Sequence, residues 1–222
     1  MKLEDFFRGF YIQTRLLKVD DRSVVVKCYS SSTSFKWYLI SPAFRRYPYT
    51  SDPIERMNRE INFLTYNWGE RIKVPRLLDF DYETLCIYRE FIEGEEIYST
   101  LHFIELGKAL RYIHDEGFAL GDTKIENFIY NSVINVIDAE QSIETRNTSY
   151  FAWDLLVLTF SMAYKFLKDP HTFYLNLVSL LDGYSIDKEI AKELTNISNI
   201  PLLTLIPFTH YNYFRKAVEK FL

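Results

Sequence analysis

The sequence predicts an α+β fold, in which a strand-rich first part carries one helix and a mostly helical second part follows. Apolar and β-branched residues gather in short runs up to about residue 92, most densely at 24–26, as strands require. Beyond that point apolar residues recur at helical spacing, and the nearly all-apolar stretch 151–167 indicates a buried central helix. We therefore divide the chain into a part at 1–92 and a part at 93–222, which together form one domain.

Strand signals in the first part are apolar runs separated by turn residues. The runs at 11–19 and 23–29 flank an Asp-Asp pair and predict a β-hairpin, and those at 77–82 and 85–92 predict two more strands. Between them, Ser51-Asp52-Pro53 predicts a helix start, because a capping residue precedes a proline in the first turn. The helix carries apolar residues at helical spacing: Ile54, Met57, Ile61 and Leu64.

Helical patterns dominate the second part. The stretch 102–115 has one apolar face and stops at Gly117, a typical signal for a helix C-terminus. A short hairpin is predicted at 128–130 and 133–137, around Asn131-Ser132. Weaker helical patterns follow at 171–182, 187–196 and 209–221.

Composition excludes several classes of protein. The formal net charge of −4 argues against a broad basic surface, so we expect no direct nucleic-acid partner. The 7 glycines form no GxG, which excludes a dinucleotide fingerprint, a Walker loop and a standard kinase glycine-rich loop. The longest apolar stretch, 155–164, is too short to cross a bilayer. We expect a cytoplasmic protein without a transmembrane segment.

Cys28 and Cys86 are the only cysteines and form no CxxC motif. Each is interpreted as a small apolar strand residue of a protein in a reducing compartment. The histidines show no metal-ligand spacing, so no structural zinc site is expected.

The segment between the 102–115 helix and the hairpin is the most informative one. Asp122, Lys124 and Asn127 form a D-x-K-x-x-N pattern, and Asp138 follows the predicted strand pair. The D-x-x-x-x-N spacing is weak by itself, since both residue types are common in loops. It becomes specific when a helix ending in glycine precedes it and a strand pair ending in aspartate follows.

This pattern resembles the catalytic loop of small, atypical protein-kinase-like phosphotransferases. The similarity spans roughly residues 20–165 and is nearest to RIO-type kinases, the kinase-like subunit of the tRNA-threonylcarbamoylation complex and lipopolysaccharide core kinases. It implies a two-lobed kinase-like fold with a small antiparallel sheet, ATP as phosphate donor, and Mg²⁺ or Mn²⁺ as the metal. Phosphoryl transfer needs an acceptor hydroxyl held in line and cations that neutralise the phosphate oxygens.

The resemblance implies a role for each polar residue of the loop. Asp122 would orient the acceptor hydroxyl and take its proton, and Lys124 would contact the transferred phosphate. Asn127 and Asp138 offer the oxygen ligands that a hard divalent cation prefers.

Lys27 ends the predicted strand 23–29, where the related pattern V-A-I-K places its phosphate-binding lysine. Glu60, on the helix that follows, is expected to hold Lys27 in an ion pair. Glu55 is the alternative partner, although a carboxylate in the first helical turn also compensates the helix dipole.

Residues 88–94 resemble the segment that links the two lobes in these kinases. Backbone groups of Glu90 and Ile92 would then bind the adenine edge. The alternative is an edge strand that enters a turn.

Three departures from the pattern bear on function. No glycine-rich loop precedes Lys27, and the metal-binding turn reads Asp-Ala-Glu. Only 15 residues separate Asp138 from Asp154, without an Ala-Pro-Glu motif, so a long peptide-docking segment is absent from the sequence. Asp154 is expected to brace the backbone of the catalytic loop by accepting N–H bonds.

Three functions remain open. The leading interpretation is an ATP-dependent atypical serine/threonine protein kinase, and the alternative is a kinase for a sugar, lipopolysaccharide or other small hydroxyl-bearing substrate. The missing peptide platform favours the alternative, as do Arg45 and Arg46, which could bind an anionic substrate. The third is a pseudokinase scaffold or a partner in a protein complex, against which the retained polar residues argue.

Overall fold

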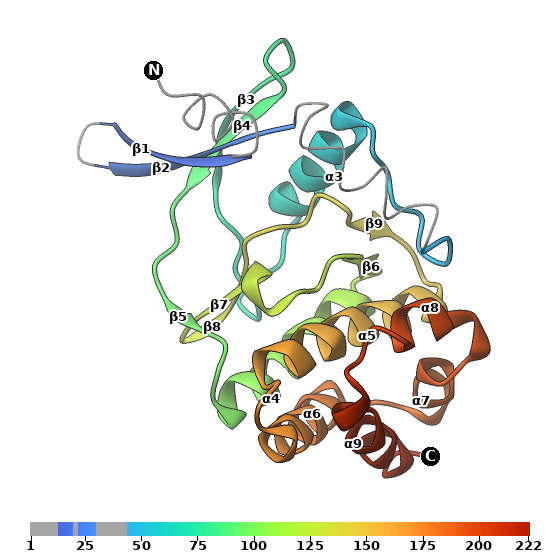
Figure 1. Cartoon of the computed structure of the whole chain (residues 1–222). Coiled ribbons are helices and arrows are strands. Elements are labelled where there is room, and N and C mark those ends of the chain that lie inside the picture. Colours follow the sequence, from blue (N-terminus) through green and yellow to red (C-terminus); the bar gives the residue numbers. More distant parts are fainter. Residues whose placement is uncertain (1–12, 20–21, 30–43) are drawn as a thin grey trace, which may run out of the picture.

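The computed structural model describes residues 13–19, 22–29 and 44–222. These ranges form a mixed α/β structure with antiparallel sheets and seven α-helices (Figure 1). The strands are β1 (Thr14–Val19), β2 (Arg22–Cys28), β3 (Leu77–Asp81), β4 (Cys86–Glu90), β5 (Glu95–Glu96), β6 (Phe118–Ala119), β7 (Phe128–Asn131), β8 (Val133–Val136) and β9 (Ile143–Glu144). The helices are α3 (Pro53–Thr65), α4 (Thr100–Asp115), α5 (Thr148–Lys165), α6 (Pro170–Tyr184), α7 (Lys188–Leu194), α8 (Ile200–Leu203) and α9 (Phe208–Glu219).

The first four strands form one antiparallel sheet in the order β1-β2-β4-β3. Helix α3 lies beside this sheet, and a small core of Tyr29, Met57, Leu64 and Ile87 joins the two. Helix α3 starts where the sequence predicts: Asp52 caps it by accepting a hydrogen bond of 2.7 Å from the Glu55 N–H, and Pro53 lies in the first turn.

Helices α4 to α9 occupy the other end of the molecule (Figure 1). Almost every side chain of α5 between Phe151 and Ala163 is buried in one large core, as its unbroken apolar sequence predicts. Helices α4 and α6 cross closely because Gly107 and Gly183 face each other; a Cβ on Gly107 would lie 2.2 Å from the Leu180 carbonyl oxygen. Among the described helices, none combines the length and apolar character that a membrane span needs.

All of the predicted helices and longer strands are confirmed, apart from residues 11–12 of the first strand, which lie outside the described residues. The sequence did not predict the two-residue strands or α8, since such short elements carry no periodicity.

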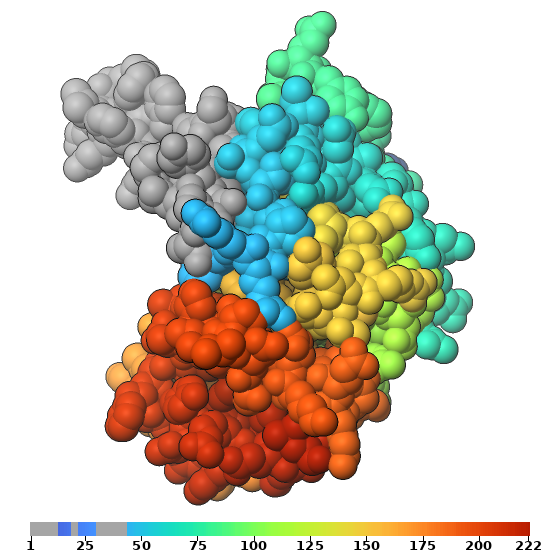
Figure 2. Space-filling model, turned by 90° about the vertical axis from the view of Figure 1, so that its right-hand side faces the viewer, coloured from blue at the N-terminus to red at the C-terminus, as the bar shows by residue number. Residues whose placement is uncertain are grey.

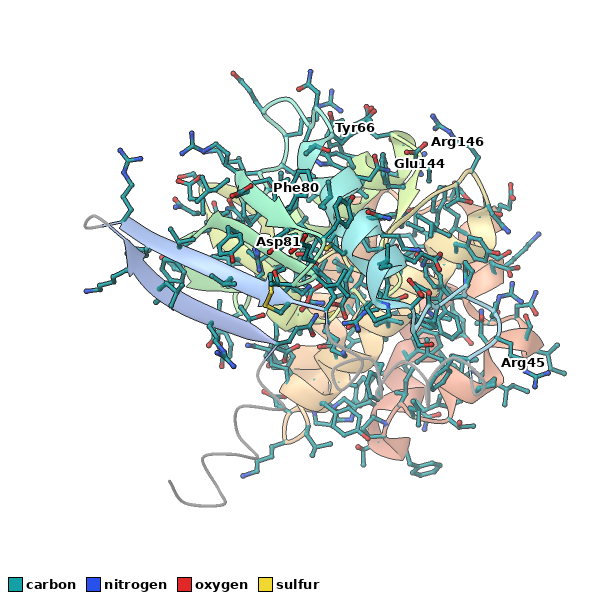
Figure 3. All side chains as sticks on the ribbon, turned by 90° about the horizontal axis from the view of Figure 1, so that it is seen from above. Arg45, Tyr66, Phe80, Asp81, Glu144 and Arg146 are labelled. Carbon is teal, nitrogen blue, oxygen red and sulfur yellow. A yellow bond between two sulfur atoms is a disulfide. The ribbon has the colours of Figure 1, made fainter. Side chains whose placement is uncertain are left out.

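The interpretation of the cysteines as free thiols is wrong. Cys28 and Cys86 form a disulfide between β2 and β4, visible as the yellow bond in Figure 3. The two residues lie directly opposite each other in the antiparallel register, with their Cα atoms 4.1 Å apart. Sequence spacing cannot show such a pairing, because it depends on which strands are neighbours and in what register.

Candidate active site

Lys27 lies at the centre of a buried ionic cluster. Its ammonium is 2.5 Å from Glu60 of α3, 2.9 Å from Asp138 and 3.2 Å from Glu140. The lysine is only 1% exposed, so these contacts are shielded from water. Glu55, the alternative partner, pairs with Arg59 instead.

Sequence reasoning missed four members of this cluster: Glu140, Gln13, Arg56 and Tyr29. Glu140 accepts a hydrogen bond of 2.6 Å from Gln13 and pairs with the fully buried Arg56 at 2.8 Å. The Tyr29 hydroxyl donates to Glu60 at 2.5 Å. The Asp-Ala-Glu turn was the available signal for Glu140, whereas nothing in the sequence distinguished Arg56 from a solvent-exposed helix residue.

The charges of the cluster depend on one another. Burial by itself lowers the pKa of Lys27, but Asp138, Glu140 and Glu60 outweigh it, so the pKa is raised and the ammonium stays charged. Desolvation, partly offset by Lys27, raises the pKa of Asp138 to about 6. Burial opposes ionisation of Glu140, yet Lys27 and Arg56 outweigh it and lower the pKa.

Asp154 of α5 is hydrogen-bonded to the backbone of the loop that carries Asp122. The fully buried Asp154 carboxylate accepts N–H bonds from Leu120 at 2.6 Å and Gly121 at 2.7 Å, which confirms the predicted bracing. It also lies 3.1 Å from Nε2 of His114, whose Nδ1 is 2.6 Å from the Tyr184 hydroxyl. Burial lowers the pKa of His114, and the contact with Asp154 only partly offsets this effect.

Asp122, Lys124 and Asn127 lie close together in this loop. The Lys124 ammonium forms an ion pair with the Asp122 carboxylate at 2.8 Å. The Asn127 side-chain amide donates to the Asp122 carbonyl at 2.6 Å, and the Asn127 carbonyl accepts from the Ile137 N–H at 2.9 Å. These bonds bring the loop next to Asp138.

Two sets of oxygen atoms in this region could hold a cation. Carboxylate oxygens of Glu60, Asp138 and Glu140 lie within 4.8 Å of one another, but the Lys27 ammonium already contacts all three. Asn127 uses its NH₂ group inside the loop, which leaves its side-chain oxygen as the group that can bind a ligand. Together with Asp138, which is 32% exposed, it fits a hard divalent cation.

The segment 44–50 covers one side of the Asp122 loop. The Tyr47 hydroxyl donates to the carbonyls of Ala119 at 3.1 Å and Gln141 at 2.9 Å, and the Tyr49 hydroxyl donates to the Gly121 carbonyl at 2.6 Å. Gly121 has φ +76°, and a Cβ there would lie 2.4 Å from the Tyr47 ring. Figure 2 shows the blue segment wedged between the yellow chain near residue 140 and the orange-red helices below.

Arg45 and Arg46, grouped as candidate anion contacts, have different surroundings. Arg46 pairs with Glu193 of α7. Arg45 is exposed and extends from the edge of the molecule in Figure 3.

Glu90 and Ile92 lie at and just beyond the end of β4. Together with Lys73, Asn131 and other residues they line a cavity of about 500 Å³. The Glu90 N–H already donates to the Arg76 carbonyl at 3.0 Å. The backbone N–H of Glu90 is therefore engaged within the protein. Its backbone carbonyl is the group that could make the predicted hydrogen bond to a nucleotide base.

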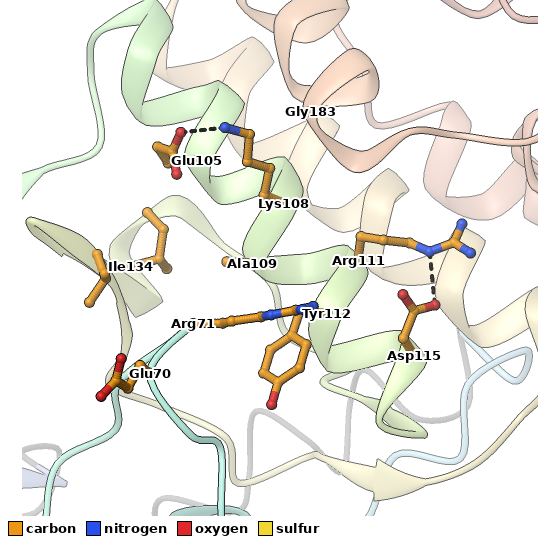
Figure 4. A pocket seen from close by; sticks show the side chains of 11 residues that line it. Glu70, Arg71, Glu105, Lys108, Ala109, Arg111, Tyr112, Asp115, Ile134 and Gly183 are labelled. Atoms are coloured by element: carbon orange, nitrogen blue, oxygen red, sulfur yellow. Dashed lines mark hydrogen bonds and ion pairs between the residues drawn. The ribbon is translucent and has the colours of Figure 1, made fainter.

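A second cavity, of about 440 Å³, lies beside α4 and away from the predicted site residues (Figure 4). Its charges are largely paired within its own wall: Lys108 with Glu105 at 2.8 Å, and Arg111 with Asp115 at 2.9 Å. We assign no function to it.

Comparisons with known proteins add little. No protein-family model matches the chain, and no curated protein does. A solved structure described as WaaP in complex with acyl carrier protein matches with a TM-score of 0.48 and 15% identity, over 94% of this chain and 84% of that one.

Proposed function

We propose that the chain is a phosphotransferase of the protein-kinase-like type, which moves the terminal phosphoryl group of a nucleoside triphosphate to an alcohol. Residues 1–92 and 93–222 would be its two lobes. The contact of Lys27 with both Glu60 and Asp138 carries this proposal, because it unites residues 33 and 111 positions apart in the arrangement that phosphate binding requires. The resemblance in sequence implied ATP as the donor.

One end of the site would bind the nucleotide phosphates, and the other end would bind the acceptor hydroxyl. Lys27, oriented by Glu60, would contact the phosphates, and Asp122 would accept the proton of the acceptor hydroxyl. A divalent cation on Asn127 and Asp138 would neutralise charge on the phosphate oxygens. Lys124, beside Asp122, would contact the phosphoryl group during transfer.

The acceptor that fits best is a small hydroxyl-bearing molecule, such as a saccharide. Tyr47 and Tyr49 cover the flank of the Asp122 loop, and Gln141 is bonded to Thr50 through both its side-chain oxygen and its amide. The short chain after Asp138 is thereby fixed in place, and within the described residues it offers no extended segment on which a peptide would dock. This arrangement favours a saccharide-type acceptor over protein serine or threonine.

A transfer assay tests the proposal. The protein is incubated with Mg²⁺ and γ-labelled ATP or GTP in separate reactions, with a panel of saccharides and with protein substrates. We expect label on a saccharide and a fall of about 10²–10⁴-fold in the rate for Asp122→Asn, with nucleotide binding retained. Asp138→Asn should lose both transfer and metal-dependent binding.

Asp115→Asn, at an exposed carboxylate of α4, is the matched control and should keep full activity. Label on protein hydroxyls alone would favour the serine/threonine interpretation. If no acceptor is labelled and Asp122→Asn changes nothing, the chain is a scaffold and the proposal is wrong.

A further inference from the structure

Arg89 of β4 is a buried cation that forms no ion pair with the carboxylates of the described residues. It is 6% exposed, and its Nε has no hydrogen-bond partner in the described part of the chain. Within the same ranges its guanidinium forms no ion pair with a carboxylate, unlike the neighbouring Lys27 and Arg56. Burying a charge without a partner is strongly unfavourable, which makes Arg89 a candidate for contact with a ligand that supplies hydrogen-bond acceptors.

The register of the sheet shows where this side chain points. Strands β2 and β4 lie side by side (Figure 1). Val25 is opposite Arg89, and Lys27 is opposite Ile87. Because side chains two residues apart share a face of a strand, Arg89 and Lys27 lie on the same face of the sheet. The positive charge of Arg89 is close enough to oppose protonation of Lys27.

Arg89 therefore lies in the proposed nucleotide cleft, between two proposed contacts. On one side is Lys27, the proposed phosphate contact, and on the other is Glu90, the proposed base contact. The Glu90 N–H is engaged with Arg76, so the protein groups near the base include a carbonyl and a guanidinium.

On the basis of the function proposed above, we propose that Arg89 is a specificity-determining residue that contacts the base of the nucleotide and favours guanine over adenine. A guanidinium has five N–H donors and no acceptor. Guanine presents two acceptors side by side, O6 and N7, which a guanidinium binds in bidentate fashion. Adenine replaces O6 by an amino group, whose donors would face the donors of Arg89.

Binding measurements test this without recourse to activity. Titration calorimetry of the full chain with Mg²⁺-GTP, Mg²⁺-ATP and Mg²⁺-tripolyphosphate gives three dissociation constants. We expect GTP to bind about tenfold or more tightly than ATP, as one bidentate contact provides. Arg89→Met should abolish the preference, and Arg89→Lys should keep only part of it.

The controls separate folding from recognition. Arg22→Met, at an exposed position of β2, should leave all three constants unchanged. The ratio of the GTP and ATP constants in the wild-type chain is informative even if Arg89→Met fails to fold, which circular dichroism would show.

Two results overturn the inference. Equal affinity of the wild-type chain for GTP and ATP would show that Arg89 does not read the base. An equal loss of affinity for GTP, ATP and tripolyphosphate in Arg89→Met would place the guanidinium on the phosphates instead. If none of the three ligands binds, the proposed function itself fails.

Discussion

The two ends of the molecule are held together by different forces. The sheet end, β1 to β4 with α3, has among its described residues a small core formed by Tyr29, Met57, Leu64 and Ile87, to which a disulfide and buried ion pairs are added. The helical end, α4 to α9, has a continuous apolar core and a close crossing of α4 over α6. Small assemblies bury too little apolar surface to be stable alone, which explains the extra links at the sheet end.

The comparison also separates stability from function. At the sheet end the ion pairs that join β2, α3 and the turn at 138–140 include Lys27, the proposed phosphate contact, and Asp138, a proposed metal ligand. At the helical end the packing residues lie away from the reacting groups, and Asp154 and Ser161 of α5 connect the core with the loop that carries Asp122. Changes at the sheet end should therefore affect folding and binding together, whereas changes in the helical core should affect folding alone.

Lys27→Met should have the largest effect. It leaves the buried Glu60 and Glu140 without their shared cation, and removing one partner of a buried ion pair destabilises by about 3–5 kcal/mol. Denaturant unfolding should show this loss, together with loss of transfer. Lys18→Met, at an exposed position of β1, should change neither quantity, and an unchanged midpoint in Lys27→Met would contradict the comparison.

Reduction of the Cys28–Cys86 disulfide should have the second-largest effect on the free energy of unfolding. The bond closes a loop over a sequence separation of 58 residues, and a disulfide typically stabilises by about 2–4 kcal/mol. The double variant Cys28→Ser with Cys86→Ser should lower the free energy of unfolding by a similar amount. The wild-type chain in excess dithiol should unfold at the midpoint of the double variant, and addition of dithiol to that variant should have no effect.

Gly107→Ala tests the helical end. The added Cβ would lie 2.2 Å from the Leu180 carbonyl oxygen and 2.7 Å from the Tyr184 nitrogen, and these backbone atoms can move only if the helices separate. We expect destabilisation of about 1–3 kcal/mol with nucleotide affinity unchanged. Combined with Gly183→Ala, the effect should be smaller than the sum, since both changes open the same crossing. Additive effects would mean that the two glycines act independently.

The smallest effect concerns pH. Burial lowers the pKa of His114, so below pH 6.5 the unfolded chain binds a proton that the folded chain does not. The contribution of neutral His114 to the free energy of unfolding should be fully present above pH 6.5 and should decline as the pH falls below that value. In His114→Gln, unfolding measured between pH 7.5 and about pH 5 should show a weaker decline than in the wild-type chain, whereas His171→Gln, at an exposed site, should retain the full decline.

Sequence patterns predicted the elements well because periodicity and capping are local properties. They also predicted that Lys27 and Glu60 would meet, and that Asp154 would accept backbone N–H bonds. They did not reveal the disulfide, which depends on strand register, or the position of Tyr47 on Gly121. Arg89 carries no signal in the sequence, since the absence of an ion pair with the described residues is visible only in three dimensions.

The contacts of Tyr47 have a consequence for the order of folding. Its hydroxyl bonds to carbonyls 72 and 94 residues further along the chain, so the segment 44–50 can dock only after those distant loops are in place. Contacts of such sequence separation pay a large loop-closure entropy and form late. A chain with α4, α5 and α6 already packed would still lack one wall beside Asp122. Completion of that wall is then expected to be a late step of folding.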